Sequence, residues 1–250
     1  MGRWSRYPVL AALLAALAIS GCAHATADPD RASGTPTSGT PTSPSRPTGQ
    51  AGTPQPPSTP AAPPFVDDVS PVTAGDISSS WRPGCPVGPE QLRRVRLGYW
   101  GFDGQPHVGT IIVHRTVTAD VIKVFAALYR ERFPIRRMEP VDEYDGSDDR
   151  SMAADNTSGF NCRKVVSTGP SKWSVHAYGQ AIDVNPVENP YLVAGKVLPP
   201  AGTAYRGRSD ERAGMAVPDG VLVEAFASVG WHWGGGWESP DYQHFSKTGG

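Results

Sequence analysis

The chain has 250 residues, of which 38% are hydrophobic and 19% are charged, and its formal net charge is −1. A chain of this length forms one or two domains. The nearly balanced charge argues against a nucleic acid or another polyanion as partner, because such partners are held by an excess of lysine and arginine.

Residues 1–21 have the features of an export signal, because Arg3 and Arg6 precede the apolar run VLAALLAALAI, which is too short to cross a bilayer well. The run ends in ISGC at residues 19–22, which resembles a bacterial lipobox. We therefore expect cleavage before Cys22 and lipidation of its thiol; the alternative is an ordinary signal peptide with a chance cysteine. Cleavage would change the net charge from −1 to −3. A multiply acylated cysteine would anchor the protein at the outer face of the bacterial cytoplasmic membrane.

Residues 22–66 are rich in Pro, Thr, Ser and Gly and contain the near-repeat SGTPTSGTPTSPSRPTGQAGTPQPP. Such a segment buries too little apolar surface to offset the entropy that is lost on ordering. We predict a disordered tether, partly in polyproline II conformation, that lets a folded domain at residues 67–250 reach a polymer beyond the membrane.

Two cysteines remain in that domain, Cys85 and Cys162. In an oxidising compartment a pair of cysteines favours one disulfide. It would close a loop of about 77 residues and contribute about 4 kcal/mol in the chain-entropy model. Two cysteines cannot form a four-thiolate zinc site.

The first predicted elements of the domain are a β-branched strand at 109–117 and an amphipathic helix at 119–132, capped by Thr118 and ended before Pro134. A second strand is predicted at 135–141. The apolar face of the helix consists of Val121, Val124, Phe125, Leu128 and Tyr129.

The sequence of the second half predicts shorter elements. A strand at 178–184 is followed by a long Pro- and Gly-rich loop at 187–217 and a helix from 218 to Gly230. An aromatic turn, GWHWGGGW, then leads to a last strand at 242–246. The apolar face of this helix consists of Val221, Leu222, Ala225, Phe226 and Val229. Helices and strands are mixed without βαβ order, which favours an α+β fold with an antiparallel sheet.

Two segments carry the candidate chemistry, SVHAYGQAIDV at 174–184 and DYQHF at 241–245. A catalytic zinc ion takes three protein ligands and keeps one open position, and His176, Asp183 and His244 could supply those ligands. The residues have other possible roles, because Asp183 could cap a turn and His244 could be a buried imidazole bonded to the backbone.

Asp241 lies three residues before His244. A carboxylate at this offset could take a proton from water at the metal and return it to the leaving amine. The oxyanion formed in such a reaction also needs a fixed positive partner.

The segment SVHAYGQAIDV resembles the S-x-H-x-x-G-x-A-x-D signature of the D-alanyl-D-alanine carboxypeptidase and L-alanyl-D-glutamate peptidase family, which includes D,D-peptidases and phage endolysins. The segment GWHWGGGWESPDYQHF resembles its closing motif, and the similarity extends over about residues 90–246. The resemblance implies a small, hedgehog-like α+β domain whose antiparallel sheet is flanked by helices. It implies zinc held by His176, Asp183 and His244, with Asp241 where the family often has a glutamate as acid/base.

Members of this family carry an arginine in an upstream R-S-x-x-x-polar segment, which Arg150, Ser151 and Asp155 match. The resemblance therefore assigns Arg150 to the scissile carbonyl and its oxyanion, with Arg163 as the alternative. Ser174 and Tyr178 are the candidate substrate-binding residues, although Ser174 could bond locally and Tyr178 could pack.

Together these features predict a monomeric, lipid-anchored zinc peptidase that hydrolyses stem peptides of peptidoglycan. Whether it is a D,D-carboxypeptidase or an L-Ala-D-Glu endopeptidase depends on the loop at 187–217. One alternative is a non-catalytic peptidoglycan-binding lipoprotein, but such a module needs no acid at Asp241. A weaker alternative is an amidase acting on the same polymer.

The remaining aromatic residues are expected to have structural roles. We predict that Trp231, Trp233 and Trp237 pack in the core and the turn rather than form a platform for sugars, and that His232 is exposed. No partner is predicted for His107 or His114.

Overall fold

The computed structural model describes residues 62–165 and 170–249, all within the second of the two units into which the chain divides, Ser58–Gly250. The predicted signal peptide, the lipidation of Cys22 and residues 22–61 of the tether lie outside the described residues. No helix in the described part of the chain combines the length and the apolar character needed to cross a membrane.

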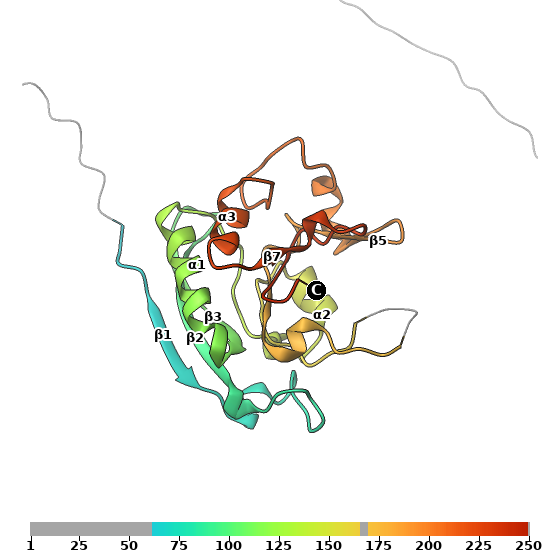
Figure 1. Ribbon diagram of the computed structural model, residues 1–250. Coiled ribbons are helices and arrows are strands. Elements are labelled where there is room, and N and C mark those ends of the chain that lie inside the picture. Colours follow the sequence, from blue (N-terminus) through green and yellow to red (C-terminus); the bar gives the residue numbers. More distant parts are fainter. Residues whose placement is uncertain (1–61, 166–169, 250) are drawn as a thin grey trace, which may run out of the picture. The chain divides into compact units, whose positions relative to one another are not determined.

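The first half of the domain is an antiparallel sheet of β1 (Asp67–Pro71), β2 (Leu92–Trp100) and β3 (Pro106–His114), in that order. The helix α1 (Thr118–Arg130) lies along this sheet (Figure 1). The two elements share one core because their apolar faces meet. The core side chains are Val95, Leu97, Ile111 and Val113 of the sheet and Val121, Val124, Phe125 and Leu128 of the helix.

Residues 62–66, the end of the predicted tether, lie on this half of the domain. The ring of Phe65 packs 5.5 Å from that of Tyr129, whose hydroxyl donates to the carbonyl oxygen of Pro63. The backbone N–H of Gly98 also donates to the carbonyl oxygen of Val66 at 2.9 Å. The chain is therefore held against the sheet before β1 begins.

The second half contains a small antiparallel sheet in the order β4 (Ala181–Asp183), β8 (His244–Ser246), β7 (His232–Trp233). In its register Asp183 lies opposite His244. The helix α3 (Val221–Ala227) packs against α1 and stacks Phe226 on Phe245, with ring centroids 4.2 Å apart. This stacking joins β8 to the apolar core.

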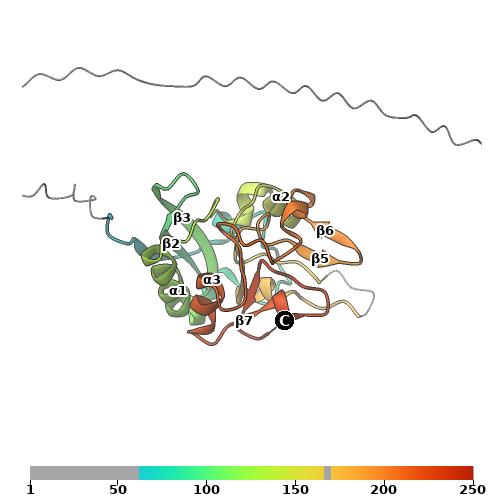
Figure 2. The same ribbon diagram turned by 90° about the horizontal axis from the view of Figure 1, so that it is seen from above.

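A hairpin of β5 (Tyr191–Val193) and β6 (Lys196–Leu198) lies on the opposite side of the domain from α1 (Figure 2). The short helix α2 (Asp148–Ala153) precedes the segment that leads to the second sheet. The 3₁₀ helices are Ala74–Ile77, Pro89–Gln91, Arg115–Val117, Val141–Tyr144, Val175–Tyr178, Pro200–Tyr205 and Gly234–Gly236.

Cys85 and Cys162 are joined by a disulfide, with their Cα atoms 5.9 Å apart. It lies beside a second apolar cluster that contains Ile77, Leu92 and Phe160. The bond links the segment before β2 to the chain that runs toward the second sheet.

The α+β class with antiparallel strands is confirmed, and so are α1, α3 and the buried apolar residues predicted for α1. The predicted helix after residue 218 begins later, at Val221. The sheet is divided: the described residues form two three-stranded sheets and a hairpin instead of one sheet.

Two predicted elements are wrong. Residues 135–141 form no strand, because this extended segment pairs only at isolated points, where Met138 accepts from Thr110 N and forms a bridge with Thr157. Residues 187–217 are not a structureless loop, since they contain the β5–β6 hairpin. Its turn uses positive φ angles at Ala194 and Gly195.

Candidate active site

His176, Asp183 and His244 come together at the second sheet, which contributes two of the three residues. His176 lies on the 3₁₀ helix Val175–Tyr178, Asp183 ends β4 and His244 begins β8. His176 Nε2 is 3.2 Å from Asp183 Oδ2 and 3.2 Å from His244 Nδ1, which is 3.1 Å from Asp183 Oδ1. The structure thus brings together the three residues that the sequence proposed as metal ligands.

The local sequence explains how His176 reaches this position. Ser174 caps the 3₁₀ helix, with its Oγ accepting from His176 N. Gly179 ends the helix at a φ of 65°, and its carbonyl oxygen accepts from His114 N at 2.8 Å. A Cβ atom at Gly179 would lie 2.7 Å from that nitrogen, so only glycine permits this contact with β3.

The hydrogen bonds of the two imidazoles decide which nitrogens face the cluster. His176 Nδ1 lies 2.7 Å from the carbonyl oxygen of Gly159, to which it must donate. Its Nε2 is therefore the nitrogen that faces Asp183. His244 presents Nδ1, and its buried Nε2 has no partner among the described residues.

The cluster fits a zinc ion. Its three ligand atoms lie within 4.8 Å of one another, and all three residues are buried. Zn–N and Zn–O distances near 2.0–2.1 Å place tetrahedral ligand atoms about 3.3 Å apart, close to the spacings here. Two imidazoles and one carboxylate are also a ligand set that zinc accepts.

The charges of the three clustered residues shift one another's pKa values. Burial disfavours the protonated form of His176, but the Asp183 carboxylate outweighs this effect and raises the pKa of His176. Burial lowers the pKa of His244. Although burial also favours the neutral acid, the two imidazoles hold the pKa of Asp183 far below its ordinary value. Asp183 is thus ionised, as a metal ligand must be.

Asp241 lies beside the cluster. Its backbone N–H donates to the carbonyl oxygen of Gly234, and its buried Oδ1 has no partner in the described part of the chain. Burial, and then the negative charge of Asp183, raise the pKa of Asp241 well above its ordinary value. A carboxyl group whose pKa is raised in this way can both hold and release a proton.

The cluster and Asp241 line one cavity of about 310 Å³. Its other polar lining residues are Asp148, Asp149, Arg163, Ser174, Tyr191 and Gln243, and its apolar lining includes Met152, Val165, Trp173, Val193, Leu198 and Trp237. The β5–β6 hairpin, which the sequence predicted as loop, contributes part of this wall. A peptide could therefore contact both polar and apolar groups here.

The two candidate arginines differ in position. Arg163 lines the cavity, and its Nε is 2.9 Å from Asp148 Oδ1. Its charge also opposes the rise in the pKa of Asp241. Arg150 is not among the lining residues; it pairs with Asp145 at 2.8 Å, and 57% of its side chain is exposed. The structure brings Arg163, not Arg150, to the cluster.

The two predicted substrate-binding residues also differ in position. Ser174 lines the cavity while capping the helix of His176, whereas Tyr178 is 40% exposed and is not among the lining residues. Sequence reasoning missed Tyr191 and Gln243. Gln243 stood inside the closing motif, next to the predicted ligand His244.

Trp231 is buried and packs on Phe226, and Trp233 donates to the carbonyl oxygen of Tyr242, so both are packing residues as predicted. Trp237 differs, because its ring lies 5.3 Å from that of His244 and lines the cavity. His232 is exposed, as predicted.

The other two histidines of the described residues have partners that the sequence did not predict. His107 Nε2 lies 3.0 Å from Asp103 Oδ2, and its ring stacks on Tyr99. His114 Nδ1 contacts the hydroxyl of Thr116 at 2.7 Å. Each pair is local to β3 or its flanks, so neither histidine belongs to the metal cluster.

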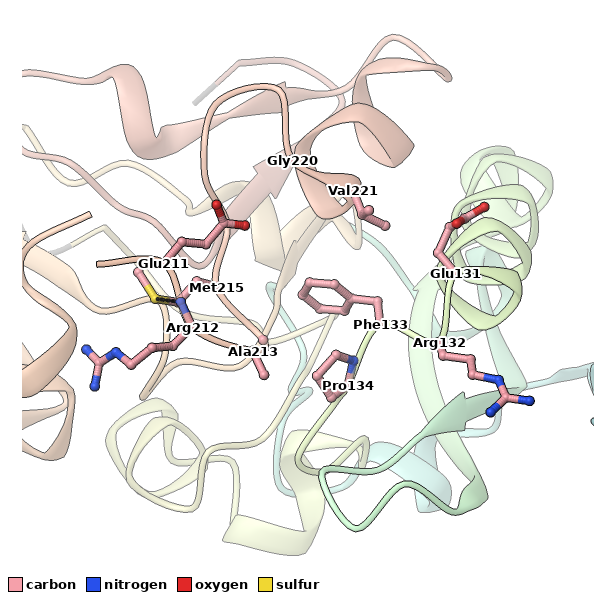
Figure 3. Close-up of a pocket in the computed structure, with 11 residues that line it drawn as sticks. Glu131, Arg132, Phe133, Pro134, Glu211, Arg212, Ala213, Met215, Gly220 and Val221 are labelled. Atoms are coloured by element: carbon pink, nitrogen blue, oxygen red, sulfur yellow. Dashed lines mark hydrogen bonds between the residues drawn. The ribbon is translucent and has the colours of Figure 1, made fainter. Parts of the chain in front are cut away.

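A second cavity, of about 440 Å³, lies between the end of α1 and the start of α3 (Figure 3). Phe133 and Pro134 lie between the side chains of Arg132 and Arg212, which point away from each other. No group of three metal-binding residues lines it among the described residues. The first cavity is therefore the candidate active site.

Residues 168–247 match the family model described as D-alanyl-D-alanine carboxypeptidase. The chain gave no match to a curated protein or to a solved structure. The family match confirms the resemblance over a segment that contains the whole cluster and Asp241, while Arg163 lies just before it. It supports a peptidase, with which the His-Asp-His cluster is compatible.

Proposed function

We propose that this chain is a zinc-dependent peptidase that hydrolyses a peptide bond in the stem peptides of peptidoglycan. The observation that carries the proposal is the buried cluster of His176, Asp183 and His244, which shares a cavity with Asp241. The family match over residues 168–247 supports the same activity.

His176 Nε2, His244 Nδ1 and the Asp183 carboxylate would hold the zinc ion. When bound, zinc supplies Lewis-acid chemistry that makes water a nucleophile at neutral pH and polarises a carbonyl group. Gly159 and the Asp183–His244 register keep the ligands oriented before the metal arrives. Such orientation by outer contacts strengthens metal binding.

Asp241 serves as the general base and then as the general acid. It accepts a proton from the attacking water as the C–O bond forms, and it gives that proton to the amine as the C–N bond breaks. Its raised pKa and its unpartnered Oδ1 suit this exchange. Aspartate thus takes the role that a glutamate often has in the family.

Arg163 stabilises the negative charge that develops on the scissile carbonyl oxygen. Its guanidinium lines the cavity, and its ion pair with Asp148 holds the side chain in place. Fixed positive groups at a developing oxyanion are a large source of rate enhancement. Arg150, paired with Asp145 on the surface, has no part in this step.

The N-terminal sequence supports a cellular location for this activity. We propose export, lipidation at Cys22 and a tether that lets a monomeric domain reach the wall from the outer face of the cytoplasmic membrane. The lipobox-like ISGC and the Pro- and Thr-rich composition of residues 22–61 support this arrangement.

The test is to incubate the purified chain with peptidoglycan and with a stem pentapeptide, with and without zinc, and to identify the products by mass spectrometry. Loss of a terminal D-alanine would identify a D,D-carboxypeptidase, and fragments cut within the stem would identify an endopeptidase. A zinc-loaded, folded protein that binds the wall but releases no product would support the non-catalytic alternative and contradict the proposal.

A further inference from the structure

Tyr191, the first residue of β5, lines the active-site cavity, yet the proposed function gives it no role. Alternate residues of this strand face the cavity: Tyr191 and Val193 line it, whereas Leu192 between them does not. This pattern is expected because successive side chains of a strand point to opposite faces. The Tyr191 side chain therefore points toward the proposed active site and not to the outside of the hairpin.

A backbone bridge places Tyr191 opposite Asp241, the proposed acid/base. Leu192 N donates to the carbonyl oxygen of Pro240 at 2.8 Å. On the other side of the bridge, Tyr242 N donates to the carbonyl oxygen of the residue before Tyr191, at 3.4 Å. Tyr191 and Asp241 are thus a non-hydrogen-bonded antiparallel pair, in which the two side chains lie close together on one face.

The hydroxyl of Tyr191 is open to a ligand. It makes no hydrogen bond within the described part of the chain, and it is not among the buried side-chain atoms that lack a partner. The hydroxyl of Tyr144, by contrast, donates to Glu139 Oε2 at 2.7 Å. A group of the substrate can therefore reach the Tyr191 hydroxyl without displacing another partner.

Two charged groups of the cavity act on this hydroxyl. Burial, and then the charge of Asp241, raise the pKa of Tyr191, and the charge of Arg163 opposes that rise. The phenol thus keeps its proton at neutral pH and can donate it in a hydrogen bond. A peptide that reaches Asp241 and Arg163 presents carbonyl oxygens as the acceptors for such a donor.

We propose that Tyr191 is a further catalytic residue, whose hydroxyl donates a hydrogen bond to the carbonyl oxygen of the bond that is cut. The inference rests on the proposed function and adds a second donor beside Arg163. This hydrogen bond strengthens as water attacks, because the carbonyl oxygen then gains negative charge. Since Arg163 shares its charge with Asp148, an additional donor contributes to the stabilisation of the oxyanion.

The experiment removes the hydroxyl and keeps the ring. Wild-type and Tyr191→Phe proteins, both loaded with zinc, act on a stem pentapeptide. We expect kcat to fall about 10–100-fold and KM to change less than about twofold, because the bond is strongest in the transition state. Zinc content and Tm should equal those of the wild type. Tyr205→Phe, the same change at a partly buried position outside the cavity, should leave kcat unchanged.

A phosphinate analogue of the same peptide separates this role from a structural one. It carries a phosphinate and a methylene group in place of the cut amide, and so has the charge and shape of the tetrahedral intermediate. Its Ki should rise in Tyr191→Phe by about the factor by which kcat/KM falls. An unchanged Ki, a rise in KM alone, or a lower zinc content or Tm would overturn the inference.

The failure of this inference can be told apart from the failure of the proposed function. Zinc-dependent cleavage that is equal in the wild type and in Tyr191→Phe contradicts the inference alone. If the folded, zinc-loaded wild type cuts no peptide, the result contradicts the proposed function and, with it, the inference.

Discussion

The two halves of the domain differ in what they bury. The sheet β1–β2–β3 and α1 enclose apolar side chains, with Val95, Leu97 and Ile111 fully buried. The sheet β4–β8–β7 and its loops also bury polar and ionisable groups, among them His176 and Asp183. Apolar burial stabilises a fold, whereas burial of a polar or ionisable group costs stability unless that group is paired.

This difference predicts opposite responses to substitution. A change in the first half should lower the free energy of unfolding and leave the chemistry intact. A change in the cavity of the second half should reduce activity with little loss of stability. The following experiments test that separation.

The largest effect is expected from loss of the metal. Chelation of zinc, or His176→Ala, should lower kcat/KM at least about 10³-fold, because metal catalysis supplies several kcal/mol of transition-state stabilisation. Zinc content is measured alongside peptide cleavage. Added zinc should restore the chelated wild type and not the variant; full activity in a metal-free protein would contradict the proposed function.

The arginines provide a matched pair for the second prediction. Arg163→Ala should lower kcat about 10²–10³-fold, the usual cost of removing an oxyanion partner. Arg150→Ala should change kcat less than about twofold, because a surface ion pair contributes little. Steady-state kinetics with one stem peptide compares the two variants. A larger fall in kcat for Arg150→Ala than for Arg163→Ala would assign the oxyanion role to Arg150.

The first half supplies the third prediction. Leu128, 1% exposed on α1, packs in the main core. Leu128→Ala should lower the free energy of unfolding by about 2–5 kcal/mol, because it leaves a cavity. Denaturant unfolding measures this, and kcat at a temperature where the variant is folded should match the wild type. Val69→Ala, at a position that is 42% exposed, is the control and should cost less than about 0.5 kcal/mol.

The fourth prediction is a dependence of stability on pH. Glu188 is 2% exposed, and its Oε1 lies 3.6 Å from Arg136 Nη2. Burial, and then the charge of Asp155, raise the pKa of Glu188 from 4.5 to about 8. The folded protein thus keeps a proton that the unfolded chain loses. This contribution to stability is full below pH 4.5 and is lost as the pH rises through about 8.

Denaturant unfolding at several pH values between 5 and 9 measures this loss. Glu188→Gln should flatten the fall in stability, because the amide mimics the protonated acid. Glu143→Gln, which removes a charge from an exposed position, should keep the wild-type slope. An equal slope in all three proteins would show that another group controls the dependence.

The sequence predicted α1 well because its apolar residues recur at helical spacing and all five are buried. It also predicted the metal cluster, since a loop and a short strand bring His176 and Asp183 to one point. The β5–β6 hairpin escaped prediction because its strands have three residues each, too few to show a period.

The residues next to Arg150 and Arg163 in the sequence did not show which arginine reaches the active-site cavity. Arg150 fits a family pattern, but Ser147 caps α2 and accepts from Arg150 N, and the Arg150 side chain pairs with Asp145 at the surface. Arg163 reaches the cavity through tertiary contacts, such as the bond from Ser174 N to its carbonyl oxygen.

The most direct test of the central claim is peptide cleavage by Asp241→Asn loaded with zinc. Asparagine keeps the size of the side chain but cannot take a proton from water. We expect kcat to fall about 10²–10⁴-fold, the range for a general acid/base, with zinc content and Tm equal to those of the wild type. Wild-type kcat in that protein would contradict the claim that Asp241 and the metal cluster form one catalytic site.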